Sequence, residues 1–304
     1  MIRKFFNFLF SLAAIFILSR ALIRSLPGDP LDSLLSETAL TIPREKIFQD
    51  LNLHLSFFDA CWVDLTRLLK GDLGYSLVSR EPVLPLLIGK LAKTLALSGG
   101  ALLISLAFAI PCGILCSYPF SSTRSRFIAR IARLFAAVSV IVPIAWIGPI
   151  LLYVFAVAVP WFEFRGSFLL ACLALSVPLA GSWSRLIEVR TREEMKQPYF
   201  QASLARGVPI LKAIGKHALG PSAGALLAIL GSQLGALLAG SFIAEWIFDW
   251  PGMGVAWIQA ILQRDYPVME AATLLGASCC LLGVLVGDLL QRVWDPRQRG
   301  GASR

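Results

Sequence analysis

The fold class follows from one stretch of the sequence, QPYFQASLARGVP at residues 197–209, together with the charge-free residues 220–241 that come after it. The first part is polar and basic, whereas the second is long and apolar enough to cross a membrane as a helix. Gly207 permits backbone angles that end a helix, and Pro209 suits the first turn of another. The stretch predicts a helix–turn–helix element beside a membrane span; an ordinary loop between two spans is the simpler alternative.

The composition indicates an integral membrane protein. Of 304 residues, 57% are hydrophobic and 15% are charged, and the mean hydropathy is +0.71. Soluble domains carry about 25% charged residues. A net charge of +9 would favour nucleic acid as the partner of a soluble protein, but in a membrane protein the position of the basic residues matters more. We therefore expect a lipid bilayer, and no nucleic acid, as a partner.

Six charge-free stretches predict an all-α protein with six transmembrane helices. Pro111, Pro143 and Pro178 lie inside three of these stretches, where they are tolerated but leave kinks. A cleaved signal peptide is the alternative for the first stretch, but Arg20 lies in the middle of the best cleavage site. The stretches are residues 5–19, 94–123, 134–162, 166–184, 218–244 and 271–287.

The basic residues predict the orientation and the parts of the chain. Lys and Arg number 17 in the N-terminus and in residues 119–133, 185–217 and 292–304, against 11 elsewhere, so the first group is expected in the cytoplasm. Both termini are then cytoplasmic. The expected parts are an N-terminal helix (1–24), an extracytoplasmic segment with amphipathic helices (25–93), a five-helix core (94–292) with a cytoplasmic loop (185–217), and a tail (293–304).

No residue pattern indicates catalysis or metal binding. Five of the six cysteines lie in apolar stretches, where cysteine acts as a small hydrophobe, and no spacing resembles a zinc site. His54 and His217 fall on opposite predicted sides of the membrane. No phosphate-binding glycine loop, nucleophile elbow or pair of intramembrane carboxylates is present. We expect no catalytic residue, no metal ligand and no cofactor on this chain, so any ATP hydrolysis belongs to another subunit.

Two further patterns suggest sites. Gly220/Gly224 and Gly231/Gly235 are four residues apart, so each pair lies on one helix face that permits close approach. Gly224, Gly231 and Gly235 are expected either to pack against helices of this chain or to line a pathway beside a partner. The segment that begins Glu245-Trp246-Ile247-Phe248 combines interfacial aromatic residues with a Pro-Gly turn, which suits an outer gate.

Several segments, in the right order, resemble the inner-membrane permease subunits of bacterial ABC importers of the oligopeptide/dipeptide/nickel family. The resemblance covers nearly the whole chain, and its most specific match is Glu245–Gly254 followed by Arg264–Val268. The other matching segments are Ser25–Pro30, Gly71–Ser76, Pro82–Leu84, Tyr199–Gly207 and Asp295–Arg297.

The resemblance implies a type I importer permease in the bacterial inner membrane. It implies a second permease, two ABC ATPases that bind ATP and magnesium, and an extracytoplasmic solute-binding protein. It assigns the ATPase-coupling loop to Tyr199, Gln201, Ala202, Ser203, Arg206, Gly207 and Pro209. It assigns the gate or binding-protein contact to Glu245, Asp249, Trp250, Pro251, Gly252 and Gly254.

Departures from the family pattern bear on docking and on the solute. Gln201-Ala202-Ser203 stands where the family has Glu-Ala-Ala, and Gly220-Pro221 replaces an Arg-Asn pair. The family includes importers of oligopeptides, dipeptides, nickel chelates and glutathione, so peptide import has nickel or metal-chelate import as its alternative. An ion-driven secondary transporter and a membrane anchor without a pathway are the alternatives of other classes. An ion-driven carrier would be expected to show intramembrane acids.

Overall fold

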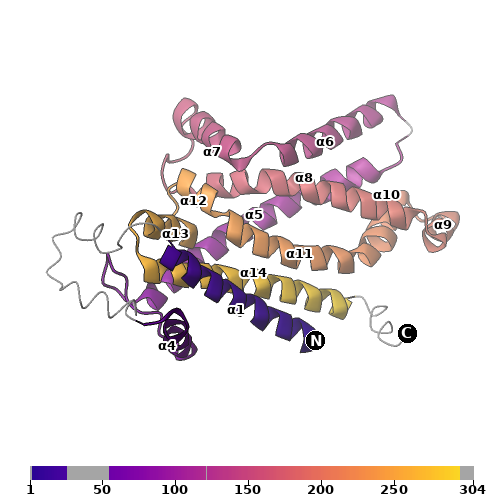
Figure 1. The fold of residues 1–304 in the computed structure, drawn as a ribbon. Coiled ribbons are helices and arrows are strands. Elements are labelled where there is room, and N and C mark those ends of the chain that lie inside the picture. The colour runs from indigo at the N-terminus through magenta and orange to yellow at the C-terminus, as the bar shows by residue number, and fades with distance from the viewer. Residues whose placement is uncertain (1, 26–54, 121, 295–304) are drawn as a thin grey trace. The chain divides into compact units, whose positions relative to one another are not determined.

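A computed structural model describes residues 2–25, 55–120 and 122–294 (Figure 1). The regular elements in these ranges are helices, and Tyr75 and Pro82 form an isolated bridge, so the predicted all-α class is confirmed. Two of the segments that resemble the family fall outside the described residues. Ser25–Pro30 lies outside them except for Ser25, and Asp295–Arg297 lies wholly outside. The chain divides into two compact units, which are described separately. Unit 1 holds residues up to 94 and 251–279, and unit 2 holds residues 95–250 and those after 279.

Unit 1 combines helices from both ends of the chain. Its elements are α1 (Ile2–Ser25), α4 (Phe57–Leu69), the first part of α5 (Val83–Ser117), α13 (Met253–Leu262) and the first part of α14 (Tyr266–Trp294). Ser56 caps α4 by accepting a hydrogen bond from the backbone N–H of Asp59. Val83 and Leu87 of α5 pack with Met253 and Ala256 of α13 and with Val268 of α14. These apolar contacts hold the unit together.

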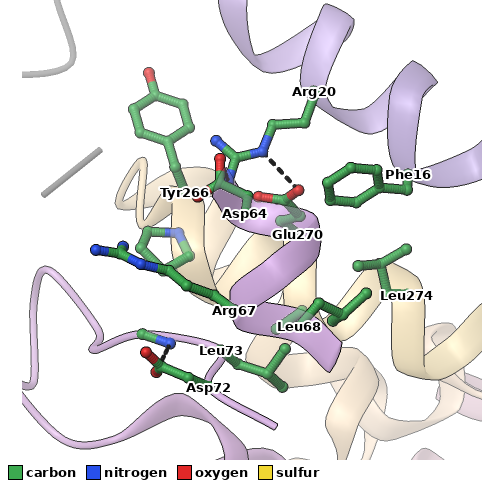
Figure 2. Close-up of a pocket in the computed structure, with 13 residues that line it drawn as sticks. Phe16, Arg20, Asp64, Arg67, Leu68, Asp72, Leu73, Tyr266, Glu270 and Leu274 are labelled. Atoms are coloured by element: carbon green, nitrogen blue, oxygen red, sulfur yellow. Dashed lines mark hydrogen bonds and ion pairs between the residues drawn. The ribbon is translucent and has the colours of Figure 1, made fainter. Parts of the chain in front are cut away.

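An ionic cluster joins three helices of unit 1 (Figure 2). Arg20 of α1 lies 2.5 Å from Asp64 of α4 and 2.8 Å from Glu270 of α14. All three side chains are largely buried, with exposed fractions of 17%, 10% and 11%. Removing one partner of such a cluster leaves an uncompensated buried charge, which is strongly destabilising. The cluster therefore fixes α1 and α4 against α14.

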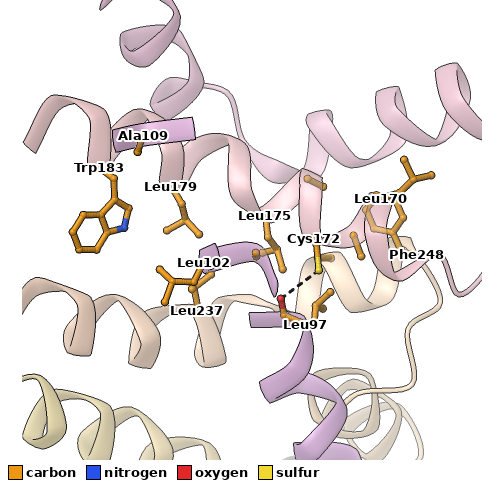
Figure 3. Close-up of a cluster of buried hydrophobic side chains, with 14 of the residues drawn as sticks. Leu97, Leu102, Ala109, Leu170, Cys172, Leu175, Leu179, Trp183, Leu237 and Phe248 are labelled. Carbon is orange, nitrogen blue, oxygen red and sulfur yellow. Dashed lines mark hydrogen bonds between the residues drawn. The ribbon is translucent and has the colours of Figure 1, made fainter. Parts of the chain in front are cut away.

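Unit 2 is built around α8 (Phe168–Met195). α8 packs on α6 (Thr123–Ile141), on α7 (Ile144–Leu152) and on the π-helical segment η2 (Ile214–Leu219). Buried Leu170, Leu175, Leu179 and Trp183 of α8 form the core with Leu97 of α5, whose carbonyl lies 3.6 Å from the Cys172 thiol (Figure 3). The remaining elements of the unit are η1 (Tyr153–Ala158), α9 (Pro198–Ala205), α10 (Ile210–Ala213), α11 (Gly220–Gly240) and α12 (Phe242–Ile247).

The described residues contain three single helices that are long and apolar enough to cross a membrane, within Val83–Ser117, Phe168–Met195 and Tyr266–Val293. Two bent pairs raise this number to five if each pair is one span. They are Thr123–Ile141 with Ile144–Ala158, and Ile210–Gly224 with Ile229–Leu238. The apolar part of α1, Phe6–Leu22, is shorter. The predicted total of six spans stays a prediction.

Proline explains the sharpest break. The sequence predicted one span with a kink over residues 134–162, but the structure ends α6 at Ile141 and turns the chain by 105° before α7. Val142 adopts an extended conformation because a following proline disfavours helical angles, and Pro143 is the N-cap of α7. α6 also begins earlier than predicted, at Thr123, and so includes four arginines that lie before the charge-free stretch.

The boundary expected between residues 93 and 94 falls inside α5, which runs from Val83 to Ser117 without a break. Charge-free stretches mark the apolar part of a helix, but a helix continues for as long as its backbone hydrogen bonds do. Lys90 and Lys93 are therefore part of α5 and not of a preceding segment.

Candidate functional site

The predicted helix–turn–helix element is present between α8 and α11. Gln197 precedes α9, and Pro198 occupies the first turn, where its missing N–H costs nothing. Gly207 has φ +80°, a left-handed angle that side-chain-bearing residues rarely adopt. The N–H of Gly207 donates to Leu204 O at 2.9 Å, and the N–H of Val208 donates to Ser203 O at 3.2 Å. This is the Schellman arrangement that ends a helix at glycine.

A small core holds this element in place. Phe200 of α9 is fully buried with Ala213 of α10 and with Ile214 and Ala218 of η2. Partly buried Ile114 and Tyr118, at the end of α5, pack against the same cluster. Burying a phenylalanine side chain contributes about 1.5–3 kcal/mol. The short helices are therefore fastened to α5 and to the chain that leads into α11.

The outward face of the element carries most of the predicted coupling residues. Exposed residues include Tyr199, Gln201, Ala202, Arg206, Gly207 and Pro209. Ser203 differs, because it is fully buried and its hydroxyl donates to Phe200 O at 2.7 Å. The prediction that Ser203 lies on a docking surface does not agree with this burial. The periodicity of so short a helix does not reveal that Ser203 lies on the inner face with Phe200.

An ionic cluster that the sequence analysis missed lies at the ends of α5 and α8. Glu188 of α8 pairs with Arg133 of α6 at 2.8 Å and with Arg192 at 3.0 Å. Arg133 and Arg192 also donate to the carbonyl of Cys116 at 2.6 and 2.9 Å. These cations satisfy a carbonyl at the end of α5 that has no partner in its own helix. Only the i,i+4 spacing of Glu188 and Arg192 was visible in the sequence.

The predicted outer loop is divided between the two units. In unit 2, Glu245 of α12 is fully buried, and its carboxylate accepts a 3.2 Å hydrogen bond from the Ser241 hydroxyl. The N–H of Trp250 donates to Glu245 O at 2.8 Å, and the Trp250 ring lies 5.3 Å from that of Phe168. Asp249 is exposed, with φ +52°. Glu245 therefore supports the loop from inside.

In unit 1, the loop continues into the start of α13. Pro251 is exposed, Gly252 is the buried N-cap of α13, and Gly254 is half-buried. The N–H of Met253 donates to the hydroxyl of Thr94 in α5 at 2.8 Å. Of the six residues assigned to the gate, Asp249 and Pro251 are the two exposed ones, and the assignment itself stays a prediction.

The small-residue face of α11 packs against the later part of α14. A Cβ added at Gly231 would lie 2.5 Å from Gly283 O and 2.6 Å from Gly287 N. A Cβ at Gly235 would lie 2.8 Å from Cys280 O. Gly231 and Gly235 therefore pack against a helix of this chain, which is one of the two alternatives that the sequence left open. Gly224 is buried in α11, and its role in a pathway stays a prediction.

Residues 109–300 match the sequence model of a family described as "Binding-protein-dependent transport system inner membrane component". The match includes α6 to α14, and with them the helix–turn–helix element and the outer loop. The match begins within α5, so it does not include α1, α4 or the first part of α5.

Curated relatives extend the similarity over most of the chain. The "Glutathione transport system permease protein GsiC" of Escherichia coli (strain K12) is 28% identical over 282 residues, which are 91% of each protein. The proteins of the same name from Shigella boydii serotype 4 and Salmonella choleraesuis are also 28% identical, again over 91% of each protein. Because the family match covers well over half of its residues, this chain belongs to the binding-protein-dependent transport system inner membrane components, and it is a membrane-spanning permease subunit of an ABC importer.

Proposed function

We propose that the chain forms, with a second permease subunit, the pathway for a small peptide-like solute, and that glutathione is the first solute to test. The proposal is supported by the name of the curated relatives, which are glutathione transport permeases. A solute-binding protein delivers the solute from outside, and two separate ATPase subunits hydrolyse ATP with magnesium. Oligopeptides, dipeptides and metal chelates are the alternative solutes. The family assignment does not favour the ion-driven alternative.

The observation that carries the ATP-driven part of this proposal is the construction of the α9–Gly207–α10 element. It presents exposed Tyr199, Gln201 and Arg206, while Phe200 fastens it to the ends of α5 and η2. A force applied to its outer face is therefore transmitted to helices that cross the membrane. Alternation between inward-open and outward-open states needs such a rigid connection, because ligand binding acts by biasing two discrete arrangements. We assign this element to the contact with an ATPase, on the cytoplasmic side.

Uptake by the reconstituted complex tests the proposal. The chain is co-expressed with the second permease and the ATPase subunits of its importer, purified, and placed in liposomes that contain ATP. Labelled glutathione should accumulate only with binding protein and ATP, and an excess of unlabelled glutathione should compete. If a dipeptide or a nickel chelate accumulates and glutathione does not, the solute assignment is wrong. If uptake follows an ion gradient without ATP, the ATP-driven function itself is wrong.

A further inference from the structure

A small pocket surrounds the Arg20 cluster of unit 1 and is named the polar pocket for the five charged residues in its otherwise mostly apolar wall (Figure 2). Its volume is about 80 Å³, and its charged lining residues are Arg20, Asp64, Arg67, Asp72 and Glu270. Arg20 is already bound to Asp64 and Glu270. Arg67 is exposed and forms no ion pair among the described residues, and Asp72 accepts a 2.9 Å hydrogen bond from the N–H of Gly74. Among the described residues, the pocket therefore offers a guanidinium without an ion pair beside an excess of carboxylates.

A larger apolar groove lies next to this pocket. It has a volume of about 660 Å³ and runs between α1, α4 and α14. The two cavities share five lining residues, Phe16, Leu68, Leu73, Ala271 and Leu274. The groove wall is almost wholly apolar, and it includes the exposed side chains of Phe58 and Trp62. A pocket with charged residues and an apolar groove thus lie side by side and share part of their walls.

The surroundings of the groove favour a lipid as its occupant. α14 is apolar and long enough to span the membrane, and α1 carries the apolar segment Phe6–Leu22. A helix with its side chains is about 10–12 Å wide. A hydrocarbon chain is much thinner and can follow the groove along its length.

We propose that the groove and the adjoining pocket together bind one aminophospholipid of the membrane, with an acyl chain in the groove and the headgroup at the polar pocket. The phosphate lies at Arg67, whose planar guanidinium suits bidentate contact with phosphate oxygens. The primary ammonium lies at the carboxylates of Asp72 and Glu270. A headgroup that carries both charges matches the two signs of charge in the pocket.

The headgroup, and not the chain, supplies the selectivity. Acyl chains of the bilayer are as apolar as leucine, so moving a chain into the groove gains little by itself. Phosphatidylethanolamine offers both the phosphate and three ammonium hydrogens. Phosphatidylglycerol lacks the cation, and the choline headgroup lacks N–H donors. The cavity should therefore prefer ethanolamine lipid to the other two.

Lipid analysis of the purified complex tests this proposal. The assembled importer is placed in nanodiscs with equal parts of phosphatidylethanolamine, phosphatidylglycerol and phosphatidylcholine, then extracted in mild detergent, and its retained lipids are counted by native mass spectrometry. The unmodified complex should retain ethanolamine lipid preferentially. Arg67→Gln should lower that retention about fivefold, the effect expected for loss of one basic contact with a headgroup. Ala13→Phe should block the groove and lower retention of all three lipids.

Lys70→Gln is the matched control, since Lys70 is exposed beside the end of α4 but lines neither cavity. It should leave retention unchanged. Equal retention of the three lipids by the unmodified complex, or equal effects of Arg67→Gln and Lys70→Gln, would overturn the proposal. Crosslinking of Cys61, which lines the groove, to the second permease in place of lipid would overturn it as well, because the occupant would then be protein.

Discussion

The hydroxyl of Ser76 donates a 2.5 Å hydrogen bond to the carboxylate of Asp265, which lies 189 residues further along the chain. The other carboxylate oxygen of Asp265 accepts a 3.1 Å hydrogen bond from the N–H of Leu77. Ser76 in turn accepts hydrogen bonds from the N–H groups of Val78 and Ser79. The segments Gly71–Ser76 and Arg264–Val268, which each resemble the family, are therefore joined in unit 1 through the buried carboxylate of Asp265.

This contact predicts a stability effect in unit 1. Asp265→Ala should lower the free energy of unfolding by about 1.5–3 kcal/mol, because hydrogen bonds to a charged group contribute about that much. Ser76→Ala should cost less, and the double variant should be less destabilised than the sum of the two. Thermal unfolding of the purified permease in detergent measures these changes. Ser79→Ala is the control, since the Ser79 side chain is exposed; additive effects of the two main variants would contradict the pairing.

The proposed coupling role of the helix–turn–helix element predicts the behaviour of Gly207. A Cβ at this position meets nothing within 4 Å, so the cost of substitution comes from φ +80° alone and is about 1 kcal/mol. Gly207→Glu should leave the permease in the membrane and leave solute capture by the binding protein intact, but change the angle between the two helices. Solute should then no longer stimulate ATP hydrolysis, and uptake should fail.

Gly207→Asn is the matched control, because asparagine tolerates left-handed angles better than most residues. It should retain much of the coupling. Full solute-stimulated ATPase activity with normal transport in Gly207→Glu would show that the element is a passive loop.

The close packing of α11 on α14 predicts a contrast between two glycines of one helix. Gly231→Ala should destabilise the permease by about 1–3 kcal/mol, because the added carbon meets the backbone of Gly283 and Gly287 and forces it to move. Gly220→Ala should be neutral or stabilising, since a Cβ there meets nothing within 4 Å and alanine favours helix. Thermal unfolding of both variants checks this order, and equal midpoints would contradict the packing.

The proposed orientation predicts which side of the membrane reaches two labelling positions. Ser79→Cys, at an exposed position of the segment expected outside, should react with an impermeant maleimide from outside, and Ala202→Cys only after the cytoplasmic side is opened. Ala202 is a better test position than the neighbouring Ser203, because Ser203 is buried and Ala202 is exposed. The unmodified protein supplies the background from its own six thiols. Labelling of both positions from one side would rule out the six-span arrangement.

The outer loop predicts a transport defect without loss of insertion. Pro251→Ala with Gly252→Ala alters the exposed turn and the N-cap of α13, next to the Met253–Thr94 hydrogen bond. Uptake should fall while the amount of permease in membranes stays the same. Thr94→Ser keeps the hydroxyl acceptor and should transport normally. Unchanged uptake in the double variant would argue against a gate or binding-protein contact here.

Local features of this protein could be read from residue order. Charge-free stretches predicted the all-α membrane class, and Gly207 with Pro209 predicted where α9 ends and α10 begins. Pro143 marked the site of the bend, although its size of 105° was not foreseen. These features depend on backbone angles and hydrogen bonds within a few residues, so the identities of neighbouring residues are sufficient to specify them.

Burial and charge pairing were decided only when distant segments came together. The sequence suggested that Ser203 and Glu245 are surface contacts, yet both are fully buried. Ser203 lies on the inner face of α9 with Phe200, and Glu245 lies on the buried side of α12. Arg20 meets Glu270, 250 residues away, and Ser76 meets Asp265. A polar side chain can be buried only where it finds a partner, and in these pairs the partner is supplied by another helix or loop. No local pattern specifies such a partner, so these parts of the site required the tertiary structure.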